Sequence, residues 1–333
     1  MNYNPSTNPR LQRLIQHYIY ESIKIHICMC SDLDFLKPTL VTINSLLINT
    51  KYPRHLICIN LLIEEGTYDA WSREIKDYFG ENMKVIFKIK EFKPPNTLMS
   101  ILQKMRENQQ IRELGCFRTI TNSLNYARFY LPYIFNECDR VIYLDGDTLI
   151  TGKIEDLYFG VNFTNSLWFA AVDAHKLASK YFNYLHPSLR FYLANIYNPK
   201  ELIFNSGVYL TSFKLWKHYK TTEKLEKWCI LNIKVPGSLI YYSGTEAPLN
   251  LVFPPNKRIK VSCHWNMVTK WKKRYPIEVD EASIIHFKGT IKPWMPRQSQ
   301  INNNIPENRQ IKEKFYNLWQ QYSQPINTQL TPN

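Results

Sequence analysis

The first half of the chain alternates strand-like and helix-like segments, and this alternation limits the fold more than any other feature of the sequence. β-branched and other apolar residues fill four strand-like segments, at 23–31, 55–63, 83–89 and 140–144. Helical spacing of apolar residues separates them, at 38–50, at 67–79 and in patterns that continue to about 131. Parallel strands require crossover connections of this kind, so we expect an α/β fold with a mostly parallel, Rossmann-like central sheet flanked by helices.

The second half of the chain departs from this regular alternation. Strand-like runs occur at 167–172 and 203–210, a helix is expected at about 214–232, and short strands are expected near 239–242, 251–253, 258–262 and 283–286. At the N-terminus, apolar residues at helical spacing between 11 and 19 predict a short leading helix after a polar arm.

The C-terminal tail, 296–333, is polar apart from an apolar stripe on an expected helix that begins near Pro306 and Asn308. The stripe consists of Ile311, Phe315, Leu318, Trp319 and Tyr322. We favour a helix that docks on the body of the protein. Lys312 and Lys314 keep a second interpretation open, in which the tail makes peripheral contact with a membrane surface.

Glycine spacing and cysteine usage exclude several classes of protein. No two of the 10 glycines are spaced as GxG, so the chain has neither the dinucleotide fingerprint GxGxxG nor the phosphate loop GxxxxGK[ST]. A bound nucleotide would therefore need other groups for its phosphates. The seven cysteines include no CxxC pair, which favours reduced thiols in a reducing compartment. No apolar run approaches the ~20 residues of a membrane helix, and the first twenty residues are too polar for a signal peptide, so we expect a cytoplasmic protein.

The balance of charge is basic. Lys and Arg number 42 against 28 Asp and Glu, which gives a formal net charge of +14 and favours acidic partners. The sharpest basic run, KWKKR at 270–274, is local and forms no stripe with stacking aromatics, so we expect no nucleic-acid partner. An anionic membrane surface or an acidic glycan acceptor is the hypothesis that the excess charge supports.

Three short blocks carry candidate chemistry. In the first, VIYLDGD, an apolar strand delivers Asp145 and Asp147 on either side of one glycine. Two carboxylates this close repel each other unless a cation lies between them, and a hard divalent ion, Mg²⁺ or Mn²⁺, prefers such oxygen ligands and can bridge to a diphosphate. The alternative is a pair of turn carboxylates in solvent.

The second and third blocks also place polar groups at strand ends. In FNSGVYL, Asn205 presents an amide to a hydroxylated substrate, or the block is an ordinary turn that enters a strand. In HFKGTIKPW, a strand ends on His286, which can complete a metal site with the two aspartates. At Gly289 a phosphate can approach the backbone closely, because glycine has no side chain. The Lys292 ammonium can bind a diphosphate through its positive charge.

These three blocks, in this order and at these separations, resemble the three motifs of glycosyltransferase family 8. The similarity extends upstream to ICMCSDLDFLKPTLVTINSLLINT and NYARFYLPYIFNECDRVIYLD, and it covers about residues 23 to 295. The resemblance implies a GT-A fold, a UDP-sugar donor, dependence on Mn²⁺ (or Mg²⁺), and transfer with retention of anomeric configuration. The matched region divides into a nucleotide-sugar-binding half at 22–160 and a smaller acceptor-side half at 161–295. With the N-terminal arm and short helix at 1–21 and the tail at 296–333, we expect four parts.

Site residues carry over from the family by position. Asp145, Asp147 and His286 match its metal ligands, and Arg128 and Asn205 match residues that contact the donor sugar. The nucleoside and diphosphate are expected to contact Cys30, Asp32, Asp34, Phe35, Gly146, Gly289 and Lys292. Phe35 replaces a common tyrosine that stacks on uracil, and a phenyl ring keeps the stacking face.

One block departs from the bacterial galactosyltransferases of the family. Glu246, in GTEAPLN, lies where those enzymes carry a glutamine between two aspartates. The block is more similar to the plant galacturonosyltransferase-like and animal glycosyltransferase-8-domain branches, so the donor sugar and acceptor do not carry over. Our hypothesis is that Glu246 lies beneath the anomeric carbon and either stabilises its positive charge or attacks it; a purely structural carboxylate is the alternative.

The sequence thus predicts a retaining, metal-dependent hexosyltransferase that moves sugar from a UDP-sugar to a glycan, lipid-linked or protein acceptor. Two rival interpretations stay open. The altered block around Glu246 allows a catalytically weak protein that only binds a sugar nucleotide. The many tyrosines allow a self-glycosylating enzyme of the glycogenin type, although none of them is marked as an acceptor.

Overall fold

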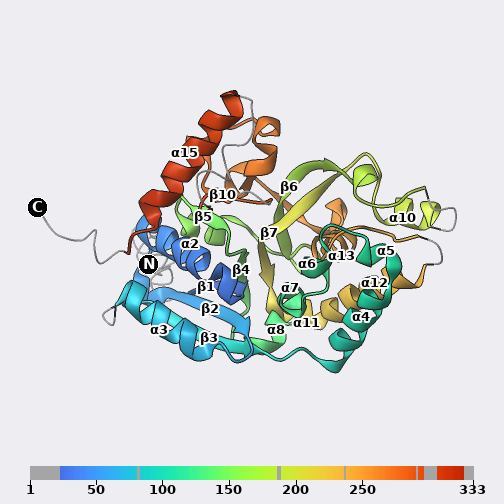
Figure 1. The fold of residues 1–333 in the computed structure, drawn as a ribbon, viewed down its shortest axis with the longest axis horizontal. Coiled ribbons are helices and arrows are strands. Elements are labelled where there is room, and N and C mark those ends of the chain that lie inside the picture. Colours follow the sequence, from blue (N-terminus) through green and yellow to red (C-terminus); the bar gives the residue numbers. More distant parts are fainter. Residues whose placement is uncertain are drawn as a thin grey trace, which may run out of the picture.

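A computed structural model describes residues 23–80, 83–185, 189–235, 238–289, 292–295 and 306–325. A seven-stranded sheet runs through the molecule in the order β3-β2-β1-β4-β7-β6-β8 (Figure 1). Its strands are β1 (Ile25–Ser31), β2 (Ile57–Glu64), β3 (Ile86–Phe92), β4 (Arg140–Leu144), β6 (Phe169–Leu177), β7 (Leu202–Ser212) and β8 (Ile259–Val261). All neighbouring strands are parallel except at β7, which is antiparallel to both β4 and β6. The expected mostly parallel α/β sheet is confirmed.

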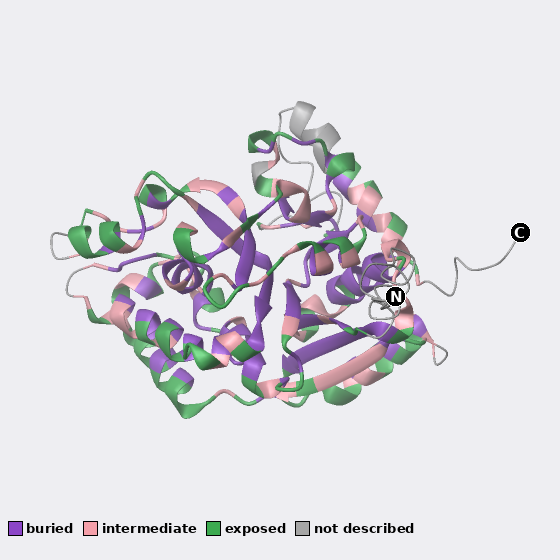
Figure 2. Cartoon of the chain, turned by 180° about the vertical axis from the view of Figure 1, so that it is seen from behind, coloured by how far each residue is buried: buried purple, intermediate pink, exposed green. Residues whose placement is uncertain are grey.

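Helices cover both faces of this sheet, and each face has its own hydrophobic core. One core is built on α2 (Leu36–Asn49), α3 (Tyr68–Phe79) and α9 (Ile154–Gly160). The other is built on α4 (Asn96–Glu107), α5 (Gln109–Arg112), α6 (Phe117–Ile120), α7 (Ser123–Tyr126), α8 (Leu131–Ile134), α11 (Phe213–His218), α12 (Thr221–Lys234) and α13 (Glu246–Val252). Strand β1 sends Ile27 into the first core and Cys28 into the second, so it is buried on both faces. Figure 2 shows the central strands of the sheet coloured as buried.

Three predicted elements of the second half are wrong. The expected strand at 251–253 is the end of α13, a helix buried on every side, so its apolar run shows no helical period. The expected strand at 239–242 contributes only an isolated bridge between Tyr241 and Phe182. The expected helix at 214–232 is divided into α11 and α12, because Lys220 adopts a left-handed backbone with φ of 50°.

A small second sheet of three strands lies beside the main one, in the order β5 (Thr148–Ile150), β10 (Ile284–His286) and β9 (Met267–Val268). The C-terminal helix α15 (Pro306–Tyr322) docks beside this sheet and against α2 (Figure 1). Phe315 and Trp319 are buried there, and Asn44 Nδ2 donates to the carbonyl oxygens of Tyr322 and Gln324, each at 2.8 Å.

The docked interpretation of the C-terminal helix is therefore the one that the structure shows. Membrane contact through the tail stays a prediction, and it would have to use side chains other than Phe315 and Trp319. The predicted leading helix at 11–19 lies outside the described residues. Within the described part of the chain, no helix has the length and apolar character needed to cross a membrane.

Candidate active site

The register of three strands brings the two aspartates and the histidine together. Strand β4 ends at Leu144, and Asp145, Gly146 and Asp147 follow it before β5 begins. Strand β10 pairs antiparallel with β5, which places His286 opposite Thr148, directly after Asp147. The amide of Phe287 also donates to the carbonyl oxygen of Asp147 at 2.9 Å. Residues far apart in the sequence thus meet at one sheet edge.

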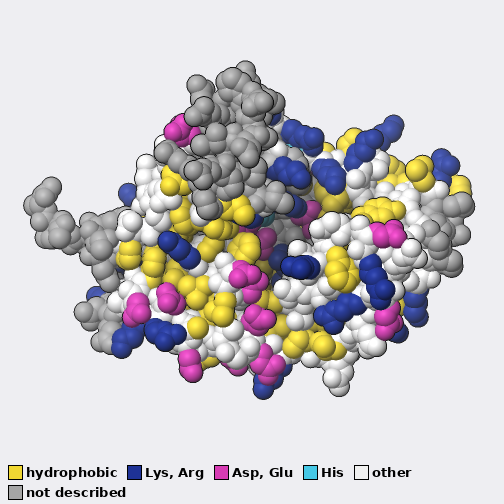
Figure 3. Space-filling view, viewed as in Figure 1, with side chains coloured by type: hydrophobic (Ala, Val, Ile, Leu, Met, Phe, Trp, Pro, Cys, Tyr) yellow, Lys and Arg dark blue, Asp and Glu magenta, His cyan; other side chains and the backbone are white. Residues whose placement is uncertain are grey.

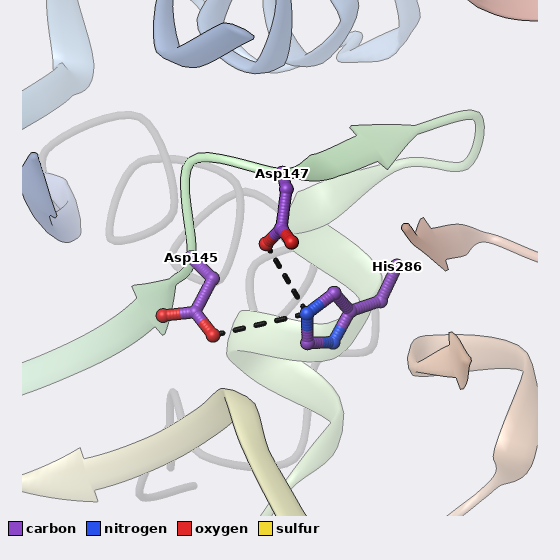
Figure 4. A group of neighbouring side chains, drawn as sticks. All are labelled: Asp145, Asp147 and His286. Atoms are coloured by element: carbon purple, nitrogen blue, oxygen red, sulfur yellow. Dashed lines mark ion pairs between the residues drawn. The ribbon is translucent and has the colours of Figure 1, made fainter. Parts of the chain in front are cut away.

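The side chains of Asp145, Asp147 and His286 converge on one point (Figure 4). Each offers one ligand atom, and these atoms all lie within 4.8 Å of one another. His286 Nε2 lies 3.2 Å from Asp147 Oδ1 and 3.8 Å from Asp145 Oδ2. Burial would raise the pKa of Asp147, but His286 and Lys292 outweigh it and hold that pKa well below its usual range. The carboxylate therefore stays ionised, as a metal ligand must be.

The other ring nitrogen of His286 tests whether a metal fits here. Nδ1 lies 2.9 Å from Asn205 Oδ1 and 3.3 Å from Asn266 Oδ1. Both are amide oxygens, which accept only, so Nδ1 carries a proton, and Nε2, which faces the aspartates, is the nitrogen that would give up its proton and bind an ion. This is the arrangement that orients a metal-binding histidine. The residues fit a divalent ion.

Gly207 on β7 holds open the space in which these groups meet. A Cβ at this position would overlap His286 Cε1 and would lie 2.6 Å from His286 Nδ1 and 2.8 Å from Asp145 Oδ2. We expect Gly207→Ala to displace the histidine or the aspartate and to weaken Mn²⁺ binding by roughly 10- to 100-fold. Calorimetric titration with Mn²⁺ measures this. Gly160→Ala is the matched control, because a Cβ there meets no atom within 4 Å; equal affinity in both variants would contradict the assignment.

A cavity of about 490 Å³ opens beside the aspartates, which is within the usual size range of small-molecule sites. Its lining includes the predicted residues Cys30, Asp32, Phe35, Arg128, Asp145, Gly146, Asp147, Gly289 and Lys292. Asp34 is exposed on the short 3₁₀ turn after β1 and does not line the cavity. Residues that sequence reasoning missed also line it, among them Arg118, Asn122 and Asn125.

One end of the cavity is built at the carboxyl end of β1. Asp32 caps the following turn, with its Oδ1 accepting from the amide of Phe35 at 3.0 Å. The rings of Phe35 and Trp294 pack nearly perpendicular to each other, at an interplanar angle of 80° and with centroids 5.9 Å apart. Burial raises the pKa of the Cys30 thiol to about 12, so the thiol is neutral. The end of β1 therefore offers one aromatic ring, one carboxylate and one neutral thiol.

Two cationic side chains lie against the aspartates. Arg128 Nη2 donates to Asp145 Oδ1 at 3.0 Å, and its guanidinium lies 4.7 Å from the ring centroid of Tyr143. The Tyr143 hydroxyl also donates to Asp145 Oδ1, at 2.9 Å. Lys292 Nζ donates to Asp147 Oδ2 at 2.5 Å and to the carbonyl oxygen of Phe287 at 2.6 Å. Both cations line the cavity, so a phosphate bound there would lie near fixed positive charge.

Glu246 begins α13 and is joined to the metal-ligand group through Asn205. Asn205 Nδ2 donates to Glu246 Oε2 at 2.6 Å, while Asn205 Oδ1 lies 2.9 Å from His286 Nδ1 and accepts from the amide of Gly207 at 3.1 Å. Both ends of the Asn205 amide are therefore engaged by protein groups. Neither Glu246 nor Asn205 lines the cavity.

Two further residues hold Glu246, and sequence reasoning missed both. Lys288 Nζ donates to Oε2 at 2.7 Å, and the Tyr181 hydroxyl donates to Oε1 at 3.0 Å. Burial would raise the pKa of Glu246, but Lys288 above all, with Tyr181 and the Ser206 amide, lowers it. Lys288 lies inside the HFKG block close to His286, so the sequence could have identified it as a residue near the site. Nothing in the sequence indicated that Tyr181 lies near Glu246, because Tyr181 belongs to a separate segment that contains none of the three motifs.

Solved structures of glycosyltransferases share this fold. An active-site mutant of LgtC superposes with a TM-score of 0.60 at 16% sequence identity, over 87% of this chain and 94% of that chain. The galactosyltransferase LgtC in complex with donor and acceptor sugar analogues gives 0.58 at 16% identity, over 90% and 100%. At this level of identity the likeness shows the fold, which is GT-A. The described part of the chain thus combines a GT-A fold with two aspartates and a histidine as candidate metal ligands.

The chain belongs to glycosyl transferase family 8, whose family model matches residues 26–297. Among curated proteins it is similar to glycosyltransferase 8 domain-containing protein 2 of Bos taurus, with 26% identity over 81% of this chain and 78% of that protein. It is similar to galacturonosyltransferase-like protein 4 of Arabidopsis thaliana, with 27% identity over 84% and 76%. These matches confirm the resemblance that the three motifs indicated.

Proposed function

We propose that this chain transfers a hexose-type sugar from a UDP-linked donor to a hydroxyl group of a glycan, lipid-linked or protein acceptor, with retention of anomeric configuration. The observation that carries the proposal is the convergence of an aromatic ring, fixed cations and candidate metal ligands on one cavity. The names of the relatives, a galactosyltransferase and a galacturonosyltransferase-like protein, support a hexose-type sugar.

The donor would lie in the cavity between the end of β1 and the aspartates. Phe35 offers a face for the uracil base, and Arg128 and Lys292 supply positive charge for the diphosphate. Asp145, Asp147 and His286 would hold the divalent ion, which supplies further positive charge to the diphosphate when bound. Most of the described lining, between residues 30 and 147, lies in the expected donor half at 22–160, and the expected acceptor-side half at 161–295 contributes Gly289 and Lys292.

Glu246 would stabilise the positive charge that develops at the anomeric carbon. Its Oε2 accepts from Asn205, Lys288 and the Ser206 amide, and its Oε1 accepts from Tyr181. Four donors lower the basicity of a carboxylate and fix its place, which favours electrostatic stabilisation over nucleophilic attack. Asn205 then acts as a positioning residue that links Glu246 to His286, and the acceptor hydroxyl attacks from the face that the diphosphate leaves.

A screen of UDP-sugars tests this proposal directly. The purified chain is incubated with UDP-glucose, UDP-galactose, UDP-xylose and UDP-galacturonic acid, with Mn²⁺ and with EDTA, and released UDP is measured. We expect slow hydrolysis of at least one donor that requires Mn²⁺ and that an added acceptor accelerates. A protein that only binds a sugar nucleotide would retain UDP-sugar and release no UDP. A self-glycosylating enzyme would gain the mass of a sugar without added acceptor.

A further inference from the structure

Four cationic side chains gather on the acceptor-side half, around Glu246. Lys176, Lys270, Arg274 and Lys288 form this basic cluster, and none of them lines the donor cavity. They come from three separate segments, namely the end of β6, the 3₁₀ helix η8 (Thr269–Arg274) and the residues after β10. Figure 3 shows Lys and Arg side chains gathered beside the hollow of this face.

The backbone is shaped to bring two of these segments together. Pairing between β6 and β7 is irregular between Ala171 and Leu177, and His175 within that stretch has a left-handed backbone with φ of 49°. Arg274 Nη1 donates to the carbonyl oxygen of His175 at 3.1 Å, which ties η8 to the end of β6. Irregular strand pairing of this kind often re-aims a side chain at a functional site. Lys176 is the residue that follows this irregular point.

The basic cluster is continuous with the Glu246 carboxylate. Lys176 Nζ lies 4.5 Å from the ring centroid of Tyr181, whose hydroxyl donates to Glu246 Oε1 at 3.0 Å. Lys288 Nζ lies 2.7 Å from Glu246 Oε2. A ligand that contacts Lys176 would therefore lie one tyrosine ring away from the carboxylate that we place beneath the donor sugar.

Positive charge exceeds negative charge in this cluster. Glu246 is paired with Lys288, and among the described residues no carboxylate forms an ion pair with Lys176, Lys270 or Arg274. Burial lowers the pKa of Lys176, and the charges of Lys288, Lys270 and Arg274 lower it further against the opposing effect of Glu246. Cations that repel one another in this way gain free energy when an anion binds among them.

Resting on the function proposed above, we propose that the acceptor carries an anionic group, a carboxylate or a phosphate, which Lys176, Lys270 and Arg274 bind beside Glu246. The position of the cluster assigns the anion to the acceptor, because the donor diphosphate has its own cations, Arg128 and Lys292, inside the cavity. The net charge of +14 left the kind of acidic partner open. The cluster locates part of that excess at the acceptor side of the site.

Matched pairs of acceptors test this inference. Lactose is compared with 3′-sialyllactose, methyl-esterified trigalacturonate with trigalacturonate, and glucose with glucose 6-phosphate, using the UDP-sugar that the donor screen selects. We expect kcat/KM to be at least about tenfold higher for an anionic member than for its neutral partner. The carboxylate and phosphate pairs distinguish the two sources of negative charge.

Charge-reversal variants test whether Lys176 and Lys270 bind the anionic group of the acceptor. Lys176→Glu and Lys270→Glu should each lower the ratio of kcat/KM for the anionic acceptor to kcat/KM for its neutral partner by about tenfold or more. Lys104→Glu on α4 is the control, since it makes the same charge change at an exposed lysine of another element. Equal use of neutral and anionic acceptors, no transfer to any anionic acceptor, unchanged variants, or use of UDP-galacturonic acid with neutral acceptors would each overturn the inference. Absence of donor hydrolysis in the unmodified chain would instead contradict the proposed function.

Discussion

Replacing Asp147 with asparagine is expected to abolish Mn²⁺ binding and to lower transferase turnover by about 10³-fold or more. Asp147 is largely buried, and its two oxygens lie 3.2 Å from His286 Nε2 and 2.5 Å from Lys292 Nζ. Asparagine keeps the shape but removes the negative charge, and its amide group either faces the Lys292 ammonium, donor against donor, or faces the metal position. Both the ion and the lysine therefore lose a negative charge in one substitution, and one of them also loses its oxygen partner.

The measurement combines Mn²⁺ titration, UDP release and circular dichroism, because loss of a buried partner for Lys292 also lowers stability. Asp156→Asn is the control, since Asp156 is an exposed carboxylate in the first turn of α9. We expect that control to bind Mn²⁺ and turn over donor like the unmodified chain. A folded Asp147→Asn variant with normal Mn²⁺ affinity would overturn the metal assignment.

The parallel part of the sheet could be predicted from the sequence because its signals are local. Each strand from β1 to β4 is a short apolar run, and each helix between them carries its own periodicity, so neither assignment depends on distant residues. The antiparallel strand β7 was recognised as a strand, but its direction was not predicted, because direction depends on which neighbours it pairs with. The same limit explains why β5 and β9, with three and two residues, were missed.

The candidate metal ligands could be predicted from the motifs, whereas the hydrogen bonds that hold them in place could not. Asp145, Asp147 and His286 lie in blocks with recognisable spacing, and the structure brings the three together. Asn205 was expected to face a sugar, but its amide is engaged by His286, Gly207 and Glu246. Such contacts depend on the register of β10 against β5 and on how β7 passes them, and no local pattern encodes that register.

The surroundings of Glu246 were the least predictable part of the site. Its partners Tyr181, Asn205 and Lys288 come from three segments, and the helix that it begins was partly taken for a strand. A glutamine at this position would be neutral, so a glutamate needs a compensating cation when it is buried. Lys288 supplies that cation at 2.7 Å. Glu246 and Lys288 therefore form an ion pair, and neither position considered alone in the sequence would predict this pairing.

Replacing Glu246 with glutamine is expected to lower kcat by roughly 10²- to 10³-fold, with little change in UDP or Mn²⁺ affinity. Glutamine keeps the volume and one acceptor oxygen, but it removes the negative charge that lies 2.7 Å from Lys288 Nζ. The resulting surplus of positive charge lies where the oxocarbenium-like transition state also carries positive charge, so it opposes the reaction directly. Donor binding depends on the separate cavity and is retained.

Three readouts separate electrostatic stabilisation from nucleophilic attack. UDP release gives kcat, calorimetry gives the affinity for UDP, and mass spectrometry of the unmodified chain quenched during turnover reports any sugar bound covalently to Glu246. We expect no covalent adduct, because four hydrogen-bond donors occupy the carboxylate. Glu155→Gln is the isosteric control, since that carboxylate accepts from the Thr50 hydroxyl and the Lys51 amide, each at 2.8 Å, and lies outside the site. A trapped adduct would make Glu246 the nucleophile, and near-normal turnover of Glu246→Gln would make it a structural carboxylate.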